Sequence, residues 1–454
     1  MKHGKIKLCS LTGMMFLTLG MILLVIQIIL TSIGKQHSEH ATITHWTQGQ
    51  EKTWLLKHHS NSEPPTQLIK CDRSHKFYDT CSINRPVVFE TTNSTFILME
   101  SRNEGKRTNI VIENVKPYPR KWEKQVMSTI QEVTLVAGSS SPPCLVHHDA
   151  PALVFSAGGY TGNFFHEFND GLIPLFITFK TMFQGNQEFI LVISELQQWW
   201  VSKYEDLLSS FSKYPIIDFE KEKMSHCFPS VSVGLISHGL MTITPKLMPN
   251  SETIRDFRVL LESTYGRNVT YIPKPRVNRP RLVLISRGGH DGRAILNEEE
   301  LKIVANRTGF KTILFRPTTN ASLQQSYELI NSSHAMVGVH GAALTHFLYL
   351  RPGAVFIQIV PIGPEDVADK YFGKPARELG LEYMEYKIGV KESSLIDRYS
   401  KRHLVQGAIA RNAWSKEFKS VYMREQNVRI DLVRVREYLK QAYRKAKRLM
   451  RTNG

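Results

Sequence analysis

The stretch that decides the fold runs from Ala335 to His346 and reads Ala-Met-Val-Gly-Val-His-Gly-Ala-Ala-Leu-Thr-His. The apolar residues up to Val339 predict a buried strand, His340-Gly341 predicts a tight turn, and the small residues after it open a helix. Small residues let a ligand approach the backbone, and a helix N-terminus offers free N–H groups to a phosphate. The spacing matches neither a P-loop nor a GxGxxG motif. Taken alone, the pattern fits a phosphate site or an ordinary strand–helix turn equally well.

Strands and helices alternate on both sides of this stretch. Such alternation produces parallel sheets covered by helices, with ligands at the carboxyl ends of the strands. The same alternation occurs earlier in the chain, and a Pro-rich segment at 271–280 separates the two series. We therefore expect an α/β protein with two Rossmann-like lobes that face each other across a cleft. The later series has strands at 281–286, 312–315, 335–339 and 355–360 and helices at 297–308, 322–332 and 342–348; the earlier one has strands at 153–155, 189–193 and 231–236 and helices at 164–183 and 197–211.

The domain boundaries follow from these series. An N-terminal lobe is expected at 68–272 and a C-terminal lobe at 281–430. Short β-rich runs between 87 and 136 belong to the first lobe. A basic amphipathic helix is expected at 431–450, with Asp431 as its cap.

The first 67 residues predict a membrane anchor. Residues 14–33 are almost entirely apolar and long enough to cross a bilayer. Three lysines in the tail, residues 1–13, keep that end cytosolic under the positive-inside rule, and the polar residues 34–67 form a stem. A cleaved signal peptide is the alternative, but the run is long for one and no A-x-A-like site follows it. We expect a single-pass type II protein whose folded part is lumenal.

Glycosylation signals and cysteines agree with a lumenal location. Of five cysteines, Cys9 belongs to the region of the span and four remain for pairing in an oxidising compartment. Three pairings are possible; we favour Cys71 with Cys81 and Cys144 with Cys227. No C-x2-C pair indicates a zinc site. The N-x-[ST] sequons lie at Asn93, Asn268, Asn306, Asn320 and Asn331.

The net charge of +17 invites a nucleic-acid interpretation. However, residues 411–454 hold 13 basic and 4 acidic side chains, which places +9 of the charge in the last 44 positions. A lumenal protein is separated by a membrane from the DNA and RNA of the cell, so we expect no nucleic-acid partner.

Two further motifs contain side chains suited to catalysis or phosphate binding. Arg287 and Arg293 flank a Gly-rich loop after a strand, where both can face a pyrophosphate; a pair of solvated loop arginines is the alternative. In the segment from Ser156 to Asp170, Asn163 is a candidate N-cap, and His166 and Asp170 then share a helix face. A histidine with a carboxylate one turn away is the arrangement of an oriented general base.

Together these stretches resemble plant members of glycosyltransferase family 61, the xylan-modifying pentosyltransferases, and more distantly the animal EGF-domain-specific O-GlcNAc transferase. The resemblance covers about 69–450. It implies a GT-B architecture, inverting transfer from a UDP-sugar, and a Golgi membrane location. Its motifs are Lys70-Cys71-Asp72 with Cys81, FFHEFNDG from Phe164, His226-Cys227-Phe228-Pro229, ISRGGHDGR with ILNEEEL from Ile285, and VGVHGAALTH with Val355-Phe356-Ile357-Gln358.

The resemblance also implies roles for individual residues. In the first lobe, His166, Glu167 and Asp170 would face the acceptor, and either His166 or Asp170 would remove the proton of the acceptor hydroxyl. The family's C-terminal helix would pack toward the first lobe. The expected UDP-binding residues are Arg287 and Arg293 on the diphosphate, His340, Gly341 and Ala342 at the helix N-terminus, and Asn297, Glu298 and Thr345 nearby.

The chain contains no Asp-x-Asp, through which many nucleotide-sugar enzymes hold Mn²⁺. Arginines and a helix dipole can stabilise the leaving UDP instead, so we expect no metal or other cofactor.

The expected function is transfer of xylose or arabinofuranose from UDP-xylose or UDP-arabinofuranose to xylan in the Golgi. A complex with other Golgi transferases is a further expected partner. Transfer to N-glycans or proteins, and a non-catalytic glycan-binding scaffold, are the alternatives.

Overall fold

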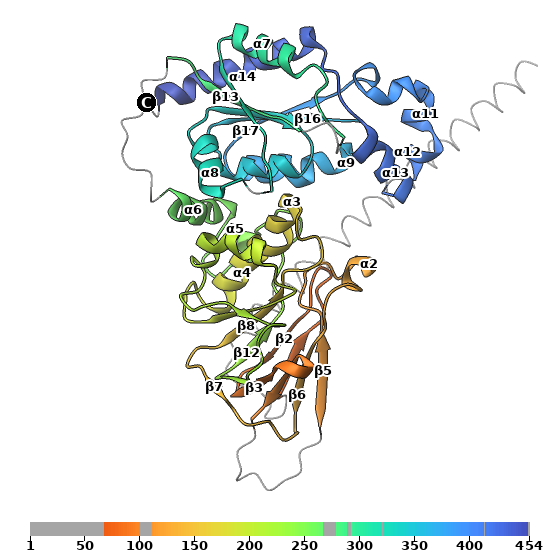
Figure 1. Ribbon diagram of the computed structural model, residues 1–454. Coiled ribbons are helices and arrows are strands. Elements are labelled where there is room, and N and C mark those ends of the chain that lie inside the picture. The colour runs from red at the N-terminus through yellow and green to blue at the C-terminus, as the bar shows by residue number, and fades with distance from the viewer. Residues whose placement is uncertain are drawn as a thin grey trace, which may run out of the picture. The chain divides into compact units, whose positions relative to one another are not determined.

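The computed structural model describes residues 68–99, 110–266, 278–287, 292–319, 321–412 and 414–452 (Figure 1). All of them belong to Gln67–Gly454, the second of two units into which the chain divides. The expected tail, membrane span and stem lie outside the described residues. Within the described part of the chain, no helix has the length and apolar character needed to cross a membrane.

Over the described residues the fold is mixed α/β with three sheets, two before residue 267 (the first lobe) and one after 277 (the second lobe). In the first sheet, the strands β12, β8, β9 and β10 are parallel, and β2 and β1 continue it antiparallel. Every residue of β8 and β9 is buried, as expected for central parallel strands covered on both faces. In order across the sheet the strands are β1 (Lys70–Asp72), β2 (Thr80–Ile83), β12 (Val231–Val233), β8 (Ala152–Ser156), β9 (Ile190–Ser194) and β10 (Ile217–Asp218).

The β-rich runs expected between 87 and 136 form a separate second sheet with mostly antiparallel neighbours. Residues of β6 alternate between buried and half-buried, which is the pattern of a strand with one face on the core. The first lobe therefore contains more than the single Rossmann-like sheet that the alternation predicts. In order the strands are β5 (Val111–Val115), β6 (Val133–Ala137), β4 (Thr95–Leu98), β3 (Val87–Glu90), β11 (His226–Phe228) and β7 (Val146–His147), with η1 (Thr91–Asn93) between β3 and β4.

The third sheet is entirely parallel, and its strand order of 2-1-3-4-5 is that of a doubly wound fold. The order reverses between β13 and β15, so the carboxyl ends of these two strands flank the expected ligand crevice. The strands are β14 (Lys311–Phe315), β13 (Arg281–Ile285), β15 (Ala335–Val339), β16 (Val355–Val360) and β17 (Glu382–Lys387).

Helices cover both faces of this sheet because its side chains alternate between two apolar cores. Leu282 and Leu284 pack in one core with α7 and α14, whereas Val283 and Ile285 pack in the other. Figure 1 shows α7 and α14 on one side of the sheet and α8 on the other. The helices are α7 (Glu298–Thr308), α8 (Leu323–Asn331), the 3-10 helix η5 (Ala342–Tyr349) and α14 (Leu432–Thr452).

One apolar core joins the two lobes. It contains Phe168 and Phe257 from the first lobe together with Phe347 and Phe356 from the second. The first-lobe helix α6 extends this contact, since Arg258 Nε donates a 2.7 Å hydrogen bond to the carbonyl of Leu350. The first-lobe helices are α2 (Lys124–Met127), α3 (Phe164–His166), the π-helical η2 (Glu167–Leu172), α4 (Ile173–Met182), α5 (Gln198–Leu208), η3 (Pro245–Leu247) and α6 (Ile254–Tyr265).

The C-terminal helix α14 is amphipathic as predicted, and Asp431 caps it by accepting from the N–H groups of Val433 and Arg434. Its buried stripe packs on α7, β16 and β17 of the second lobe. The expectation that it packs toward the first lobe is wrong, because Val435, Leu439, Ala442 and Ala446 complete the core on the outer face of the third sheet. Leu449, near the end of the helix, belongs instead to the core that contains residues of both lobes. That stripe consists of Val435, Leu439, Ala442, Ala446 and Leu449.

Short helices precede and follow β17, between β16 and α14. Those after β17 surround a small apolar core that includes Leu404, Phe418 and Tyr422. The elements are α9 (Glu365–Ala368), η6 (Asp369–Gly373), α10 (Lys374–Glu378), η7 (Val390–Glu392), η8 (Ser394–Asp397), α11 (Lys401–Gln406), α12 (Ala408–Arg411), α13 (Lys416–Ser420) and η9 (Val421–Glu425).

Candidate active site

A cavity of about 870 Å³, referred to below as the cleft, is lined by residues from both lobes. On the second lobe it lies at the carboxyl ends of β13 and β15, where the strand order reverses. Among the described residues, its lining includes six basic side chains and one carboxylate, Glu123, so it suits an anionic ligand. The basic residues are Arg120, Lys124, Arg287, Arg293, Lys419 and Arg424.

The second-lobe wall of the cleft is built around Gly341. This residue follows β15 and has φ +152°, a conformation that L side chains rarely adopt. A Cβ atom at this position would lie 2.3 Å from Arg287 Nη1 and 2.9 Å from Arg293 Nη1. The missing side chain therefore lets both guanidinium groups reach the first turn of η5. Arg293 Nη1 also donates a 3.1 Å hydrogen bond to the carbonyl of His340.

His340 in the same wall is a neutral hydrogen-bond donor. Tyr383 OH is 2.7 Å from Gln358 Oε1 and 3.1 Å from Glu385 Oε2, and it donates along the shorter contact. Gln358 Nε2 is then left to donate to His340 Nδ1 at 2.7 Å. The proton of the imidazole is therefore on Nε2. Burial, together with the charges of Arg293 and Arg287, lowers the pKa of His340 to about 3. His340 thus adds an N–H donor to this wall without adding charge.

The first-lobe wall is built on the helix that starts after Asn163. Asn163 caps it as predicted, because its Oδ1 accepts from the N–H of Phe165 at 3.1 Å. The expected pair on one helix face is present: His166 Nδ1 lies 2.7 Å from Asp170 Oδ2. The helix is π-helical at Glu167–Leu172, which is a frequent feature of functional sites.

Asp170 is 2 % exposed and surrounded by donors. Arg120 Nε donates to its Oδ1 at 2.9 Å, Tyr118 OH donates to its Oδ2 at 3.1 Å, and Asn169 Nδ2 also donates to it. A buried carboxylate with this many partners is suited to holding other groups in place.

His166 lies between this carboxylate and the cleft. Arg120 Nη2 is 3.0 Å from His166 Nδ1, but the shorter contact is the one to Asp170 Oδ2, which can only accept. The proton is therefore on Nδ1, and Nε2 has a free lone pair. The ring stacks on Tyr160 with centroids 4.2 Å apart, and Tyr160 OH donates to Glu123 at 2.6 Å. This is the geometry of an oriented general base.

The structure places Glu167 away from the cleft. Its Oε1 accepts from the N–H of Gly162 at 2.7 Å and its Oε2 accepts from Trp200 Nε1 at 2.5 Å. Burial raises the pKa of Glu167. The carboxylate thus fixes the turn before the helix.

Residues 164–357 match the sequence model of the family Glycosyltransferase 61. That segment contains His166, Arg287, Arg293 and Gly341. Xylan glycosyltransferase MUCI21 of Arabidopsis thaliana is 39 % identical over 414 residues, covering 85 % of this chain and 82 % of that protein. The chain belongs to glycosyltransferase family 61. The resemblance stated from the sequence is confirmed.

Other relatives extend this family assignment. Alpha-1,3-arabinosyltransferase XAT3 of Oryza sativa subsp. japonica is 37 % identical over 82 % of this chain and 64 % of that protein. Beta-1,2-xylosyltransferase XYXT1 of the same species is 32 % identical over 83 % of this chain and 84 % of that protein. A more distant animal relative is protein O-linked-mannose beta-1,4-N-acetylglucosaminyltransferase 2 of Mus musculus, 24 % identical over 58 % of this chain and 46 % of that protein.

Three residues expected at the donor site of this family 61 chain do not line the cleft. Asn297 exchanges two 2.9 Å hydrogen bonds with the backbone of Ile430 and so fixes the chain before α14. Glu298 pairs with Arg316 at 3.2 Å. The side chain of Thr345 is buried in η5, 1 % exposed.

Several cleft residues were not predicted from the sequence. Arg120, Glu123 and Trp122 come from a loop in the first lobe, Tyr371 comes from η6, and Trp414 comes from the turn before α13. No local motif marks them, since each reaches the cleft only through tertiary packing. Only Arg120 has a recognisable sequence feature, because it is the last residue of a Pro-rich turn at 117–120.

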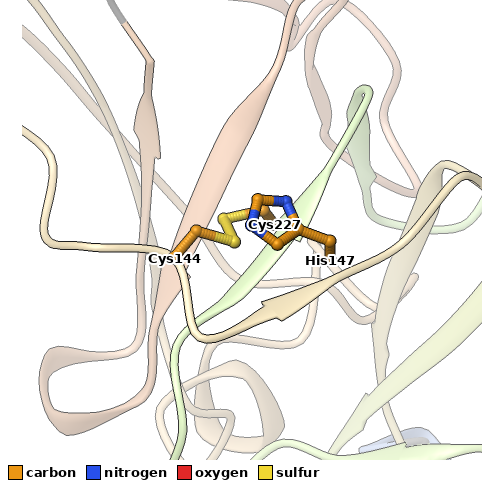
Figure 2. A group of neighbouring side chains, drawn as sticks. All are labelled: Cys144, His147 and Cys227. Carbon is orange, nitrogen blue, oxygen red and sulfur yellow. A yellow bond between two sulfur atoms is a disulfide. The ribbon is translucent and has the colours of Figure 1, made fainter.

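Both favoured disulfides are present, Cys71–Cys81 and Cys144–Cys227. The second lies beside His147, and ligand atoms of the three residues are within 4.8 Å of one another (Figure 2). Because the two sulfur atoms are bonded to each other, they are not thiolate ligands, and this group does not fit a zinc ion.

The sequons differ in their surroundings. Asn93 is exposed, whereas Asn306 and Asn331 are half-buried. Asn306 Oδ1 accepts from the N–H of Thr312 at 3.0 Å, and Asn331 Oδ1 accepts from Arg258 at 2.8 Å. Asn268 and Asn320 lie outside the described residues.

Proposed function

We propose that this chain is an inverting glycosyltransferase of GT-B architecture that transfers a pentose from a UDP-sugar to xylan in the Golgi lumen. Its similar relatives include a xylan glycosyltransferase, an arabinosyltransferase and a xylosyltransferase. One observation carries the proposal: two arginines converge on Gly341 in the same cleft that His166 enters from the opposite lobe.

The second-lobe wall would bind the diphosphate of the donor. Arg287, Arg293 and the Nε2–H of His340 surround the start of η5, whose first N–H groups have no partner within the helix. As the bond between the sugar C1 and the diphosphate oxygen breaks, the electron pair stays on UDP. The two guanidinium groups stabilise that developing charge, which is the electrostatic contribution the transfer needs.

The first-lobe wall would activate the acceptor. The hydroxyl oxygen of xylan attacks C1 from the side opposite UDP, and His166 Nε2 takes the hydroxyl proton. Asp170 then stabilises the imidazolium through Nδ1–H. From the sequence, either His166 or Asp170 could be the base. The burial of Asp170 supports His166 as the base and Asp170 as its positioning residue.

Exposed aromatic side chains in the cleft lining would hold the polysaccharide. Trp122 is 43 % exposed and Trp414 is 38 % exposed, and both line the cleft. The flat apolar faces of sugar rings pack on such indole rings. Arg120 lies 5.0 Å from the centroid of the Trp122 ring and also contacts His166.

Transfer would not need a metal ion, because the arginine pair supplies the positive charge that Mn²⁺ provides in many nucleotide-sugar enzymes. Activity in excess EDTA should equal activity with added Mn²⁺. If EDTA abolishes transfer and Mn²⁺ restores it, metal independence is wrong.

The proposal also includes a type II Golgi membrane protein with the cleft in the lumen. The support is the sequence of residues 1–67 and the two disulfides, which form in an oxidising compartment. A tagged chain should co-fractionate with Golgi membranes, and protease added to sealed vesicles should leave residues 68–454 intact.

The decisive experiment incubates the purified full-length chain with UDP-xylose or UDP-arabinofuranose and xylo-oligosaccharides, and reads product mass, linkage and anomeric configuration. The expected product gains one pentose with inverted configuration. If the chain transfers pentose only to N-glycans or proteins, xylan is not its acceptor. Absence of UDP binding would instead favour a non-catalytic scaffold.

A further inference from the structure

A second cavity, of about 290 Å³, lies beside the cleft, and the two share Asn163 and Ala342 as lining residues. Because Ala342 is the first residue of η5, a ligand whose diphosphate lies at that helix end can extend into either cavity. The pentose and the acceptor require the cleft, where His166 is. The second cavity is then the available space for the other end of the donor, its nucleoside.

Both lobes contribute to this second cavity. Phe164 from α3 and Lys203 from α5 form the first-lobe side, and His346 from η5 and the Thr318-Thr319 loop after β14 form the other. Lys203 Nζ donates a 3.0 Å hydrogen bond across the lobes to the carbonyl of Thr319. The Phe164 and His346 rings stack with centroids 4.3 Å apart and an interplanar angle of 23°. These contacts make a formed site with aromatic, cationic and hydroxyl groups.

His346 gives the cavity a defined hydrogen-bond acceptor. Its Nδ1 lies 2.8 Å from the carbonyl oxygen of Ala343, which can only accept, so Nδ1 has the proton. Burial lowers the pKa of His346 to about 4, so the ring is neutral and Nε2 presents a lone pair. Among the described residues none donates to this nitrogen, although the side chain is only 3 % exposed. His346 Nε2 is therefore an unpaired acceptor on a largely buried side chain that lines the cavity, where a ligand can supply the donor.

We propose that this second cavity binds the uracil base of the donor, with His346 Nε2 accepting the N3–H of uracil. In uracil, N3–H lies between two carbonyl oxygens. The cavity lining contains three donors for those oxygens, the ammonium of Lys203 and the hydroxyls of Thr318 and Thr319. Cytosine has a lone pair at N3 and would place acceptor against acceptor. The site therefore selects uridine nucleotides, an inference that rests on the proposed function.

The first test uses the unmodified full-length chain and calorimetric titration of UDP, CDP and N3-methyl-UDP. UDP should bind at least about tenfold more tightly than either analogue, because each analogue lacks the N3–H donor and leaves the buried His346 acceptor unpaired. Equal affinities for the three nucleotides would overturn the proposal. No binding of UDP at all would overturn the proposed function as well, so the two failures are distinguishable.

The second test replaces the acceptor. In His346→Phe, which keeps an aromatic ring against Phe164, UDP affinity should fall about tenfold to the level of CDP while inorganic pyrophosphate binding stays unchanged. The exposed His403 on α11 supplies the matched control, since His403→Phe should bind UDP like the unmodified chain. If His346→Phe retains the full preference for UDP over CDP, His346 does not read the base. Should that variant fail to fold, the analogue titration decides alone.

Discussion

The two walls of the cleft are built in opposite ways. In the first-lobe wall, charges are compensated: Asp170 is buried among three donors, and Arg120 also pairs with Glu123. In the second-lobe wall, Arg287 and Arg293 converge on a glycine, and burial keeps the adjacent His340 neutral. The difference corresponds to two tasks. A general base needs a fixed orientation and an unprotonated nitrogen, whereas a diphosphate needs concentrated positive charge and close approach to the backbone.

Removing the base should have the largest effect. His166→Ala should lower kcat by about 10²–10⁴-fold, the usual contribution of a positioned general base, with the Kd for UDP unchanged. Asp170→Asn should also lower kcat, by less, because His166 loses its orienting partner while the acid–base group remains. The measurement is initial-rate pentosyl transfer beside UDP calorimetry. Full activity of His166→Ala would remove this residue from the chemistry.

Removing an arginine should break the other wall. Arg293→Ala should lower kcat/KM for the donor by about 10²–10³-fold, because one charge-assisted contact to the leaving diphosphate is lost. Its matched control is Arg448→Ala, at an exposed arginine of α14, which should leave donor kinetics unchanged. Equal effects of the two substitutions would mean that the arginine wall has no special role.

Adding a methyl group at the centre of the second wall should have a smaller effect. Gly341→Ala places a Cβ within 3 Å of both guanidinium groups and at a positive φ. We expect KM for the UDP-sugar to rise about tenfold while the chain still folds, since a residue strained at such a φ costs about 1–3 kcal/mol. Gly353→Ala, also at positive φ but beside Leu449 of α14, is the control for strain alone. A donor KM equal in the two variants would contradict the role of Gly341.

The buried histidines predict a smaller, graded effect of pH on stability. Burial lowers the pKa of His340 to about 3 and those of His346 and His238 to about 4, from an ordinary value of 6.5. Between these values the unfolded chain binds more protons than the folded chain. The free energy of unfolding should therefore fall as pH drops below 6.5, by up to about 1.4 kcal/mol per pH unit for each histidine. Urea unfolding at pH 7.5 and 5.5 measures this, and equal midpoints would contradict it.

The sequence predicts the second lobe well because its signals are local. Alternating buried strands and helices give the parallel sheet, and the His340-Gly341 turn gives the ligand end of β15. The cap at Asn163 and the spacing of His166 and Asp170 likewise depend on one helical turn.

What the sequence did not predict depends on contacts between distant segments. Arg120 reaches Asp170 across 50 positions, and β11 joins β3 across more than a hundred. The side-chain amide of Asn297 could bind either a ligand in the cleft or the backbone of the chain. Only the folded structure shows that it binds the backbone of Ile430. The apolar stripe of α14 was visible, but its partner in the second lobe was not.

The two walls divide the work: the second-lobe wall binds UDP and the first-lobe wall performs the proton transfer. Calorimetric titration of UDP into His166→Ala and Arg293→Ala tests it most directly. His166→Ala should bind UDP with the same affinity as the unmodified chain, whereas Arg293→Ala should bind UDP about tenfold or more weakly. A loss of UDP affinity in His166→Ala with normal affinity in Arg293→Ala would contradict it.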